Sequence, residues 1–469
     1  MSKVSRRALM TGAAAVGVTA AGAVGYRVWR DREPTAPAAQ DAQGHLLWRN
    51  WSGIRDCYPA QRGAPANEAE LAGLIKTGPA PIRAVGAGHS FTALVPTSGL
   101  LLTLDQMSGV ISHDADKLQA TVRAGTRLGD LGPALAAIGQ EMPNLPDINK
   151  QSLAGAMSTG THGTGHGLKA VHGEALSFRL ATAKGEVIDC SPTSNPDIYN
   201  AARVGLGAFG VLTEVTLQNQ PLKRIVKRVE LRDFDEICED WPKVRLQHRN
   251  AEFYAIPFTG KAALITADVT DQPVVPRGPD VDTQTLMDLK KLRDLFGFVP
   301  PLRKAVAQSL MGGIKPEVMV DEGWKLLSND RPVRFNEMEF HLPREAQIPA
   351  LKEVVAAIEK HRSDVFFPIE VRTIEPDDAW LSPFYNRPSG SVAVHAYYKD
   401  DYQFLFDLIE PIFRRHEGRP HWGKLNSLKY ADFATLYPRW KDACAVRAEL
   451  DPTGRFLNPY LRSVFLGQA

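Results

Sequence analysis

The chain has 469 residues, more than a single small core organises, so the length predicts two or three domains. Apolar residues make up 44% and charged residues 23%, which is typical of a soluble globular protein. The net charge of +2 provides no basic field that would point to nucleic acid as a partner. The cysteines form no CxxC pair, which excludes zinc ribbons and disulfide scaffolds but leaves one or two disulfides open: Cys57, Cys190, Cys238 and Cys444.

Residues 1–44 are interpreted as a targeting segment followed by a linker. A basic start precedes a weakly apolar run rich in Ala, Gly and Val. Arg6 and Arg7 resemble a twin-arginine export signal, although Met10 and the lack of a following lysine depart from the usual pattern. We expect export to the periplasm through the twin-arginine machinery, with cleavage near 21–23 or 36–38. The alternatives are a general secretory signal and an uncleaved membrane anchor.

A first glycine turn follows a predicted short helix at 66–77 and a strand that begins at Pro81. Gly86 and Gly88, in "VGAGHSF", allow positive φ and close backbone approach. Successive N–H groups in such a turn can form a nest for a pyrophosphate, but many GxG turns bind nothing. His89 ends this turn. Three interpretations of it stay open: a polar loop residue, a metal ligand, or a residue that holds another ligand against the turn.

A second glycine-rich stretch, 143–167, interleaves glycines with hydroxyl side chains that could wrap a diphosphate. It lacks the lysine of a P-loop. His162 and His166 would share one face only on a helix, and the glycines disfavour a helix here, so we predict no metal site.

A third stretch, 204–217, satisfies GxGxxG, but a predicted helix precedes it and a strand follows it. This order is the reverse of a dinucleotide fingerprint, which excludes NAD binding by that motif. The segment could still lie flat against a planar cofactor.

From about Pro221 the glycine turns give way to charged helices and aromatic strands. The spacing of apolar residues predicts an amphipathic helix over 344–362 and a strand over 365–374, on which Glu370 and Arg372 share one face. A further strand carries His395. These elements predict an α+β cap domain. Taken alone, Glu370 and Arg372 could equally form a surface ion pair contributing ~0–1 kcal/mol.

The three glycine stretches, in this order, resemble the vanillyl-alcohol-oxidase-type (PCMH-type) FAD-binding domain. Within it the chain is similar to the aldonolactone oxidases and alditol oxidases, such as D-arabinono-1,4-lactone oxidase. "WRNWSG", "HWGK" and "GRFLNPYLR" add to the resemblance. It implies an α+β fold with a two-subdomain FAD-binding domain at 45–220. It also implies a substrate cap at 221–438 and a C-terminal segment, 439–469, that returns to the FAD domain.

The resemblance implies FAD bound covalently through His89, with non-covalent packing as the alternative. No cysteine lies in "THGTGHG", so a second covalent link is not expected. The other residues implied to bind FAD are Val85, Gly86, Ala87, Gly88, Ser90, Pro146, Ser152, Gly155, Ser158, Thr159, Gly160, Thr161, His162, Gly163, Thr164, Gly210 and Val211.

The resemblance also maps substrate chemistry onto Glu370, Arg372, His395 and Lys424. Arg372 or Lys424 would stabilise negative charge on the reduced flavin or polarise the substrate hydroxyl. Glu370 would hold a cation and accept hydrogen bonds, and His395 is a candidate proton acceptor. Asp147 stands where the family usually has a serine that touches the substrate, which casts doubt on a standard lactone or alditol.

The sequence therefore predicts an exported FAD enzyme that oxidises a hydroxyl of an aldonolactone or polyol. Pro146, beside the expected flavin position, favours oxygen as the acceptor, because its ring is drawn back towards its own nitrogen. The alternatives are a dehydrogenase that passes electrons to a quinone or cytochrome, and a sugar-binding protein that keeps the fold without flavin.

Overall fold

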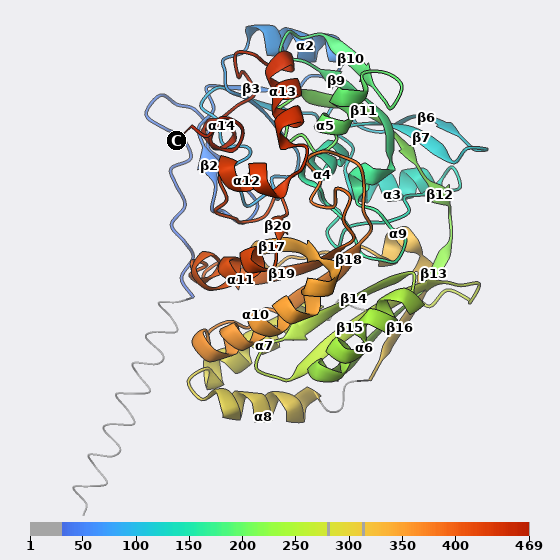
Figure 1. Cartoon of the computed structure of the whole chain (residues 1–469), viewed down its shortest axis with the longest axis vertical. Helices are drawn as coiled ribbons and strands as arrows, with labels where there is room; N and C mark the ends of the chain where they lie inside the picture. The colour runs from blue at the N-terminus through green and yellow to red at the C-terminus, as the bar shows by residue number, and fades with distance from the viewer. Residues whose placement is uncertain (1–30, 279–281, 312–314, 469) are drawn as a thin grey trace, which may run out of the picture.

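The computed structural model describes residues 31–278, 282–311 and 315–468. Arg6, Arg7 and the cleavage candidate at 21–23 lie outside the described residues. Figure 1 shows two halves stacked along the long axis, the first above and the second below. Within the described ranges, no helix combines the length and apolarity needed to cross a bilayer. All four cysteines are free, so neither of the disulfides left open by the sequence forms in this structure.

The first half holds two principal sheets. A parallel sheet has the order β3-β5-β4, and an antiparallel sheet has the order β10-β9-β11-β7-β6. The strands are β3 (Gln61–Gly63), β4 (Ile82–Val85), β5 (Leu100–Thr103), β6 (Val110–Asp114), β7 (Gln119–Arg123), β9 (Ala175–Ala181), β10 (Val187–Cys190) and β11 (Val211–Gln218). Two small pairs join β1 (Trp48–Arg49) with β2 (Asp56–Cys57), and β8 (Gln140–Glu141) with β12 (Gln220–Pro221). The helices are α2 (Glu68–Thr77), α3 (Leu128–Ala136), α4 (Leu153–Thr159), α5 (Pro196–Ala202) and the 3₁₀ turn η1 (Val171–Glu174).

The second half is built on an eight-stranded antiparallel sheet of order β16-β13-β15-β14-β18-β19-β17-β20. The strands are β13 (Arg224–Asp233), β14 (Asn250–Ile256), β15 (Lys261–Val269), β16 (Glu317–Glu322), β17 (Phe335–Pro343), β18 (Ile369–Ile374), β19 (Ser389–Tyr397) and β20 (Arg419–Pro420). The helices are α6 (Phe234–Gln247), α7 (Asp282–Phe296), α8 (Pro300–Met311), α9 (Gly323–Leu326), α10 (Gln347–His361) and α11 (Glu410–Arg415), with the 3₁₀ turn η2 (Arg344–Ala346) and the π-helical segment η3 (Leu405–Ile409).

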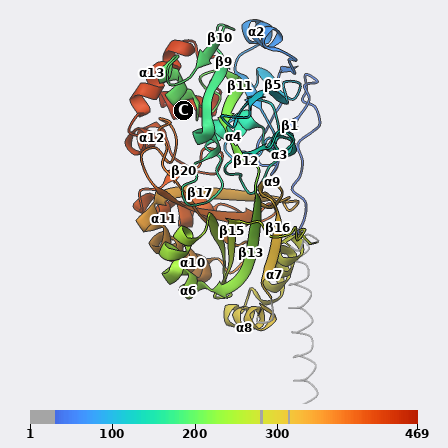
Figure 2. The same cartoon turned by 90° about the vertical axis from the view of Figure 1, so that its right-hand side faces the viewer.

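Central strands of this sheet are covered on both faces. Every residue of β18 and β19 is buried. The predicted amphipathic helix forms as α10, which buries Leu351, Val354 and Ile358 and lies on the sheet with α6, while the first half lies on the sheet's other side (Figures 1 and 2). Polar side chains on the face of the sheet that is turned towards the first half are therefore buried between the two halves.

The chain ends on the first half, where α12 (Tyr430–Leu436), α13 (Trp440–Leu450) and α14 (Pro459–Leu466) gather (Figure 1). The Ile82 amide donates to the carbonyl of Arg455 at 2.7 Å. The side-chain amide of Asn458 donates to the carbonyls of Ala93 and Pro96, both at 2.8 Å. Helix α12, which precedes residue 439, packs against α13 and α14.

Candidate active site

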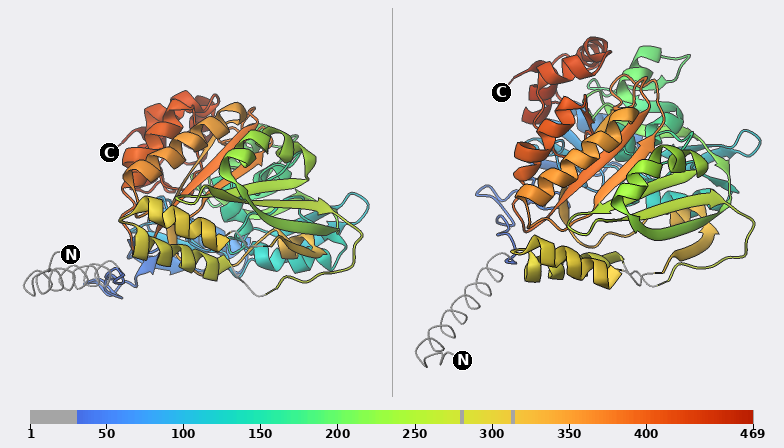
Figure 3. Two further views of the ribbon diagram at one scale, coloured as in Figure 1. Left: turned by 90° about the horizontal axis from the view of Figure 1, so that it is seen from below. Right: turned by 60° about the horizontal axis from the view of Figure 1, so that its bottom comes forward.

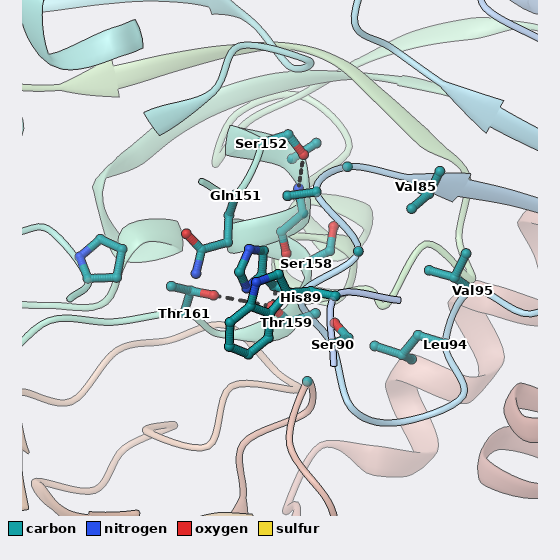
Figure 4. Close-up of a pocket in the computed structure, with 18 of the residues that line it drawn as sticks. Val85, His89, Ser90, Leu94, Val95, Gln151, Ser152, Ser158, Thr159 and Thr161 are labelled. Carbon is teal, nitrogen blue, oxygen red and sulfur yellow. Dashed lines mark hydrogen bonds between the residues drawn. The ribbon is translucent and has the colours of Figure 1, made fainter. Parts of the chain in front are cut away.

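One cleft lies between the two halves and encloses about 1510 Å³, part of it open to solvent. The three glycine stretches form one wall, and polar side chains from β17, β18 and β19 form another. Figure 4 shows the part of the cleft around the first glycine turn, with His89 near Ser158, Thr159 and Gln151.

The first glycine turn connects β4 to the loop that carries His89. Gly88 has φ +68°, a conformation that favours glycine. A Cβ at Gly86 would lie 2.2 Å from Ser152 Oγ, so only glycine lets this turn approach the N-terminus of α4. Among the described residues, no acceptor occupies the N–H groups of Ala87, Gly88 and His89. The turn is therefore free to cradle an anionic group.

The His89 ring stacks on Trp51, with centroids 4.9 Å apart and planes at 22°. The Trp51 amide donates to the carbonyl of Gly88 at 2.9 Å, which fixes the tryptophan under the turn. Burial, assisted by the nearby cation of Lys424, lowers the pKa of His89 to about 4. The imidazole is therefore neutral at physiological pH and keeps an unprotonated ring nitrogen, the form in which it is nucleophilic.

Most residues that the resemblance assigns to FAD line this cleft: Val85, Gly86, Ala87, Gly88, His89, Ser90, Pro146, Ser152, Gly155, Ser158, Thr159, Thr161, His162, Gly210 and Val211. Gly160, Gly163 and Thr164 lie behind its wall. Gly160 ends α4 with φ +75°. A Cβ at Gly163 would meet Asn144 Oδ1 at 2.3 Å. The Thr164 hydroxyl donates to the Ala251 carbonyl at 2.6 Å, which ties the two halves together.

The two histidines that the sequence places four residues apart have different surroundings. His162 is buried, whereas His166 is largely exposed beside Glu375. Residues 153–159 form the short helix α4, which the sequence analysis did not predict, and the chain beyond it is irregular until η1.

Glu339 is a fully buried carboxylate at the centre of the polar wall. Its Oε1 accepts hydrogen bonds from Arg372 Nη2 at 2.6 Å, from His162 Nε2 at 3.0 Å and from the Ser391 hydroxyl. Burial opposes its charge, but Arg372 and His162 outweigh burial and hold the pKa of Glu339 well below its usual range. Glu339 therefore fixes the Arg372 guanidinium at the cleft.

Glu370 lies on the other side of the same guanidinium, with Oε2 3.2 Å from Arg372 Nη2. Tyr254 on the neighbouring strand β14 donates its hydroxyl to Glu370 Oε1 at 2.8 Å. Burial raises the pKa of Glu370 to about 8 despite the arginine. The carboxyl is thus largely protonated at neutral pH, and it can donate as well as accept a hydrogen bond.

Half-buried Lys424 and buried Glu337 and His395 form a second polar group. Lys424 Nζ contacts Glu337 Oε2, and His395 Nε2 lies 3.7 Å from Glu337 Oε1. His395 Nδ1 faces the carbonyl of Pro368 at 3.1 Å, which can only accept, so Nδ1 carries the proton. Burial lowers the pKa of His395. Its Nε2 is therefore an unprotonated acceptor at the cleft.

The "HWGK" stretch reaches the cleft by pairing with the His89 turn. The Phe91 amide donates to the carbonyl of Gly423 at 2.7 Å, and the Thr92 hydroxyl donates to the Trp422 carbonyl at 2.9 Å. Two motifs separated by 330 residues in sequence thus lie side by side.

Asp147 lines the cleft, but its carboxylate is held by Arg331 and Asn329, at 2.9 Å and 2.6 Å. Burial opposes its charge, but Arg331 outweighs burial and lowers the pKa of Asp147 to about 2. Asp147 therefore anchors the neighbouring loop, and its oxygens are already engaged where the sequence analysis expected a substrate contact.

Sequence reasoning missed several lining residues, above all Glu337 and Glu339. A usable signal lay in "FNEMEF", where two acids alternate with apolar residues in a stretch that reads as a strand. Trp51, Gln151 and His421 also line the cleft, but no local sequence pattern predicts this, because their positions depend on contacts between distant parts of the fold.

The donor groups fit FAD. The unoccupied amides of the first turn suit the diphosphate. Gln151 offers a buried Oε1 with no partner in the described chain. Gly207 and Gly210 line the cleft with positive φ at both positions, and a Cβ at Gly210 would lie 2.5 Å from the carbonyl oxygen of Ala181, so this wall requires glycine there.

Two family models match parts of this chain. Residues 59–191 match a family model described as "FAD binding domain", and residues 215–464 match one described as "D-arabinono-1,4-lactone oxidase". The chain is 35% identical over 429 residues to L-gulono-1,4-lactone dehydrogenase from Mycobacterium tuberculosis, which covers 89% of this chain and 99% of that protein. It is 30% identical over 444 residues to L-gulonolactone oxidase from Bos taurus, which covers 90% of this chain and 98% of that protein.

The fold is similar to the crystal structure of cholesterol oxidase from B. sterolicum, with a TM-score of 0.72 and 16% identity over 92% of this chain and all of that one. These findings confirm the resemblance, the α+β fold with its FAD-binding domain, and FAD as the cofactor. The chain belongs to the D-arabinono-1,4-lactone oxidase family of FAD-dependent oxidoreductases.

Proposed function

We propose that this protein is an exported FAD enzyme that oxidises a hydroxyl group of an aldonolactone or small polyol, with oxygen as acceptor and hydrogen peroxide as product. The observation that carries the proposal is the cleft in which the His89 turn faces buried Arg372, Glu370 and His395 and half-buried Lys424. The gulonolactone enzymes among its relatives support the substrate class. When bound, FAD supplies the two-electron acceptor for the hydride of the carbinol carbon.

His89 is proposed to hold the cofactor covalently through a ring nitrogen. Its neutral imidazole, its stacking on Trp51 and its place at the tip of the first turn support this role. Stacking restricts the ring to one plane, so one orientation is pre-set for bonding.

His395 is proposed to receive the hydroxyl proton as the hydride leaves. Its Nε2 is unprotonated because Nδ1 donates to Pro368, and Glu337 lies 3.7 Å away to stabilise the imidazolium that forms. The same carboxylate contacts Lys424, so one buried acid orients both a base and a cation.

Arg372 and Lys424 are proposed to stabilise the negative charge that develops during the reaction. Arg372 is fixed by Glu339 and Glu370, so it needs no reorganisation when that charge appears. Glu370, protonated at neutral pH, can donate a hydrogen bond to a second hydroxyl or ring oxygen of the substrate.

The test is a panel of aldonolactones, alditols and free sugars, mixed with the purified yellow protein without oxygen. Loss of flavin absorbance within seconds identifies substrates, and product analysis locates the oxidised carbon. The proposal fails if lactones and alditols leave the flavin oxidised while an unrelated alcohol bleaches it.

A second candidate shares the substrate class but passes electrons to a quinone or cytochrome. The relative named a dehydrogenase favours it. Hydrogen peroxide in stoichiometric yield supports the oxidase, whereas turnover that requires a quinone analogue supports the dehydrogenase.

Export is proposed to depend on Arg6 and Arg7. Cell fractionation of the wild-type chain and of the Arg6→Lys/Arg7→Lys variant tests it. Equal periplasmic yields would contradict the twin-arginine route.

A further inference from the structure

Helices α7 and α8 form a hairpin whose turn is exposed and apolar. Phe298 is 78% exposed and Leu295 60% exposed, and Val299 and Leu302 flank them. Large apolar side chains scattered singly need no explanation, but four within eight residues of one turn form a patch. We call residues 295–302 the hairpin tip.

The hairpin is held firmly beneath its tip. Arg293 donates to the carbonyl of Asp364 at 3.0 Å and pairs with Asp400 at 2.8 Å. Arg303 donates to the carbonyls of Ser363 and Val365. Both arginines are buried, so they fix the two helices to the body of the second half. The tip is thus presented on a rigid support.

The described chain begins beside this hairpin. Asp31 pairs with Lys290 on α7 at 2.8 Å, and the Lys399 ammonium donates to the Asp31 carbonyl at 2.7 Å. Figure 3 shows the hairpin and this N-terminal stretch on the same side of the molecule. Of the thirty residues that precede Asp31, residues 8–26 contain no Asp, Glu, Lys or Arg.

We propose that the hairpin tip is a membrane-docking surface that inserts Leu295, Phe298, Val299 and Leu302 into the interface of a lipid bilayer. Two observations point to lipid as the occupant. The tip is apolar at its end, and exposed Lys304 lies beside it, an arrangement suited to the boundary between acyl chains and anionic headgroups, whereas exposed Lys291 is paired with Asp288 at 2.7 Å. The described chain also begins next to this hairpin, and in the sequence Asp31 is preceded by the uncharged stretch 8–26.

The orientation follows from the two attachments. Asp31 forms an ion pair with Lys290, and Lys290 lies on α7, the helix that ends at the tip. The first described residue is therefore attached to the same helix as the tip. In a chain that keeps its N-terminal segment uncleaved, the alternative named in the sequence analysis, a bilayer that receives this segment would therefore meet the hairpin tip, and two contacts fix an orientation that one contact leaves free.

Hydrogen–deuterium exchange on the full-length holoenzyme tests the proposal, with and without vesicles of phosphatidylethanolamine and phosphatidylglycerol at 3:1. Vesicles should slow exchange at 295–302 and leave the far end of α8, 305–311, unchanged. No change at 295–302 would overturn the proposal. Protection of 295–302 without vesicles would also overturn it, because a second copy or the N-terminal segment would then cover the tip.

A matched pair of variants measures the contribution of the tip. Leu295→Ser/Phe298→Ser should weaken co-sedimentation with these vesicles at least about tenfold, because it removes the largest apolar surface at the contact. Leu246→Ser, which changes another exposed leucine, on α6, should bind like the wild type. Both variants should oxidise substrate normally with a soluble acceptor, since neither site lines the cleft. Equal vesicle binding by all three proteins would contradict the proposal.

Discussion

The ring of His89 shows how single residues acquire reactivity from their surroundings. Burial and Lys424 keep the imidazole neutral, and Trp51 limits its orientation. The same principle acts on the acids: burial raises the pKa of Glu370 to about 8, whereas Arg331 lowers the pKa of Asp147 to about 2. Residue type alone therefore does not assign a charge state in this cleft.

Replacing His89 with alanine should release the flavin. In the wild type, denatured protein on an acidified gel should fluoresce at the mass of the chain, and the His89→Ala band should be dark. His166→Ala serves as the control, because His166 is exposed and outside the cleft. A wild-type band without fluorescence would show that the cofactor is not covalently bound.

Removing either cation of the polar wall should slow the reduction of the flavin. A fixed charge that acts in the transition state typically contributes ~3–4 kcal/mol, or roughly 10²–10³ in rate. Lys424→Ala and Arg372→Ala should each lose about this factor in anaerobic stopped flow while the protein stays folded and yellow. Lys117→Ala removes an exposed lysine and should reduce at the wild-type rate. Wild-type rates in both cleft variants would remove these cations from the mechanism.

Pro146 should control access of oxygen. It lines the cleft, and its carbonyl accepts a hydrogen bond from the Ser328 hydroxyl at 2.7 Å, which fixes the ring. Pro146→Gly removes the ring and should raise the rate at which dissolved oxygen reoxidises the reduced enzyme. Stopped-flow reoxidation measures this, and anaerobic reduction by substrate should change little. A slower reaction of the reduced Pro146→Gly enzyme with oxygen would contradict the role of Pro146 in oxygen access.

At the scale of elements, the contact between the first turn and α4 sets the geometry of the cofactor site. Gly86 lies against Ser152, whose hydroxyl accepts from the Gly155 amide at 3.3 Å and caps α4. Two glycine stretches that line one cleft are therefore linked by direct packing of a turn on a helix end.

Gly86→Ala should separate these two elements. Its Cβ would lie 2.2 Å from Ser152 Oγ and 3.1 Å from Ser152 Cβ, so the turn must move and flavin content should fall. Gly73→Ala is the matched control, because its Cβ meets nothing within 4 Å on α2. In that helix alanine should stabilise by roughly 0.5–1 kcal/mol. Flavin absorbance per protein and the Tm check both, and full flavin content in Gly86→Ala would contradict the close-packing argument.

At the scale of the whole molecule, the two halves close over a layer of ionisable side chains. Glu337, Glu339, Glu370 and Arg372 are all nearly inaccessible to water. Desolvating a charge costs stability unless a partner compensates, so this layer should make the stability of the protein depend on pH.

Glu370 should dominate the pH dependence of stability between about pH 4.5 and pH 8. Its pKa rises from 4.5 to about 8 on folding, so its contribution to stability is full below pH 4.5 and is lost as pH rises through about 8. Glu370→Gln, which mimics the protonated acid, should remove this loss. The Tm of the variant relative to the wild type should therefore increase between pH 6 and pH 9. A difference that stays constant over this range would contradict the raised pKa.

The sequence by itself determined the family, the cofactor and the order of the glycine stretches, because close backbone approach to a ligand demands glycine at fixed places along the chain. It also placed Glu370 and Arg372 on one face of a strand, since that depends only on the period of two. Only the tertiary structure revealed Glu337 and Glu339 as the acids that hold Lys424 and Arg372. It also showed that Arg331 engages Asp147. These contacts join residues that are far apart in sequence. The local sequence pattern does not predict which distant side chain a residue will contact in the folded protein.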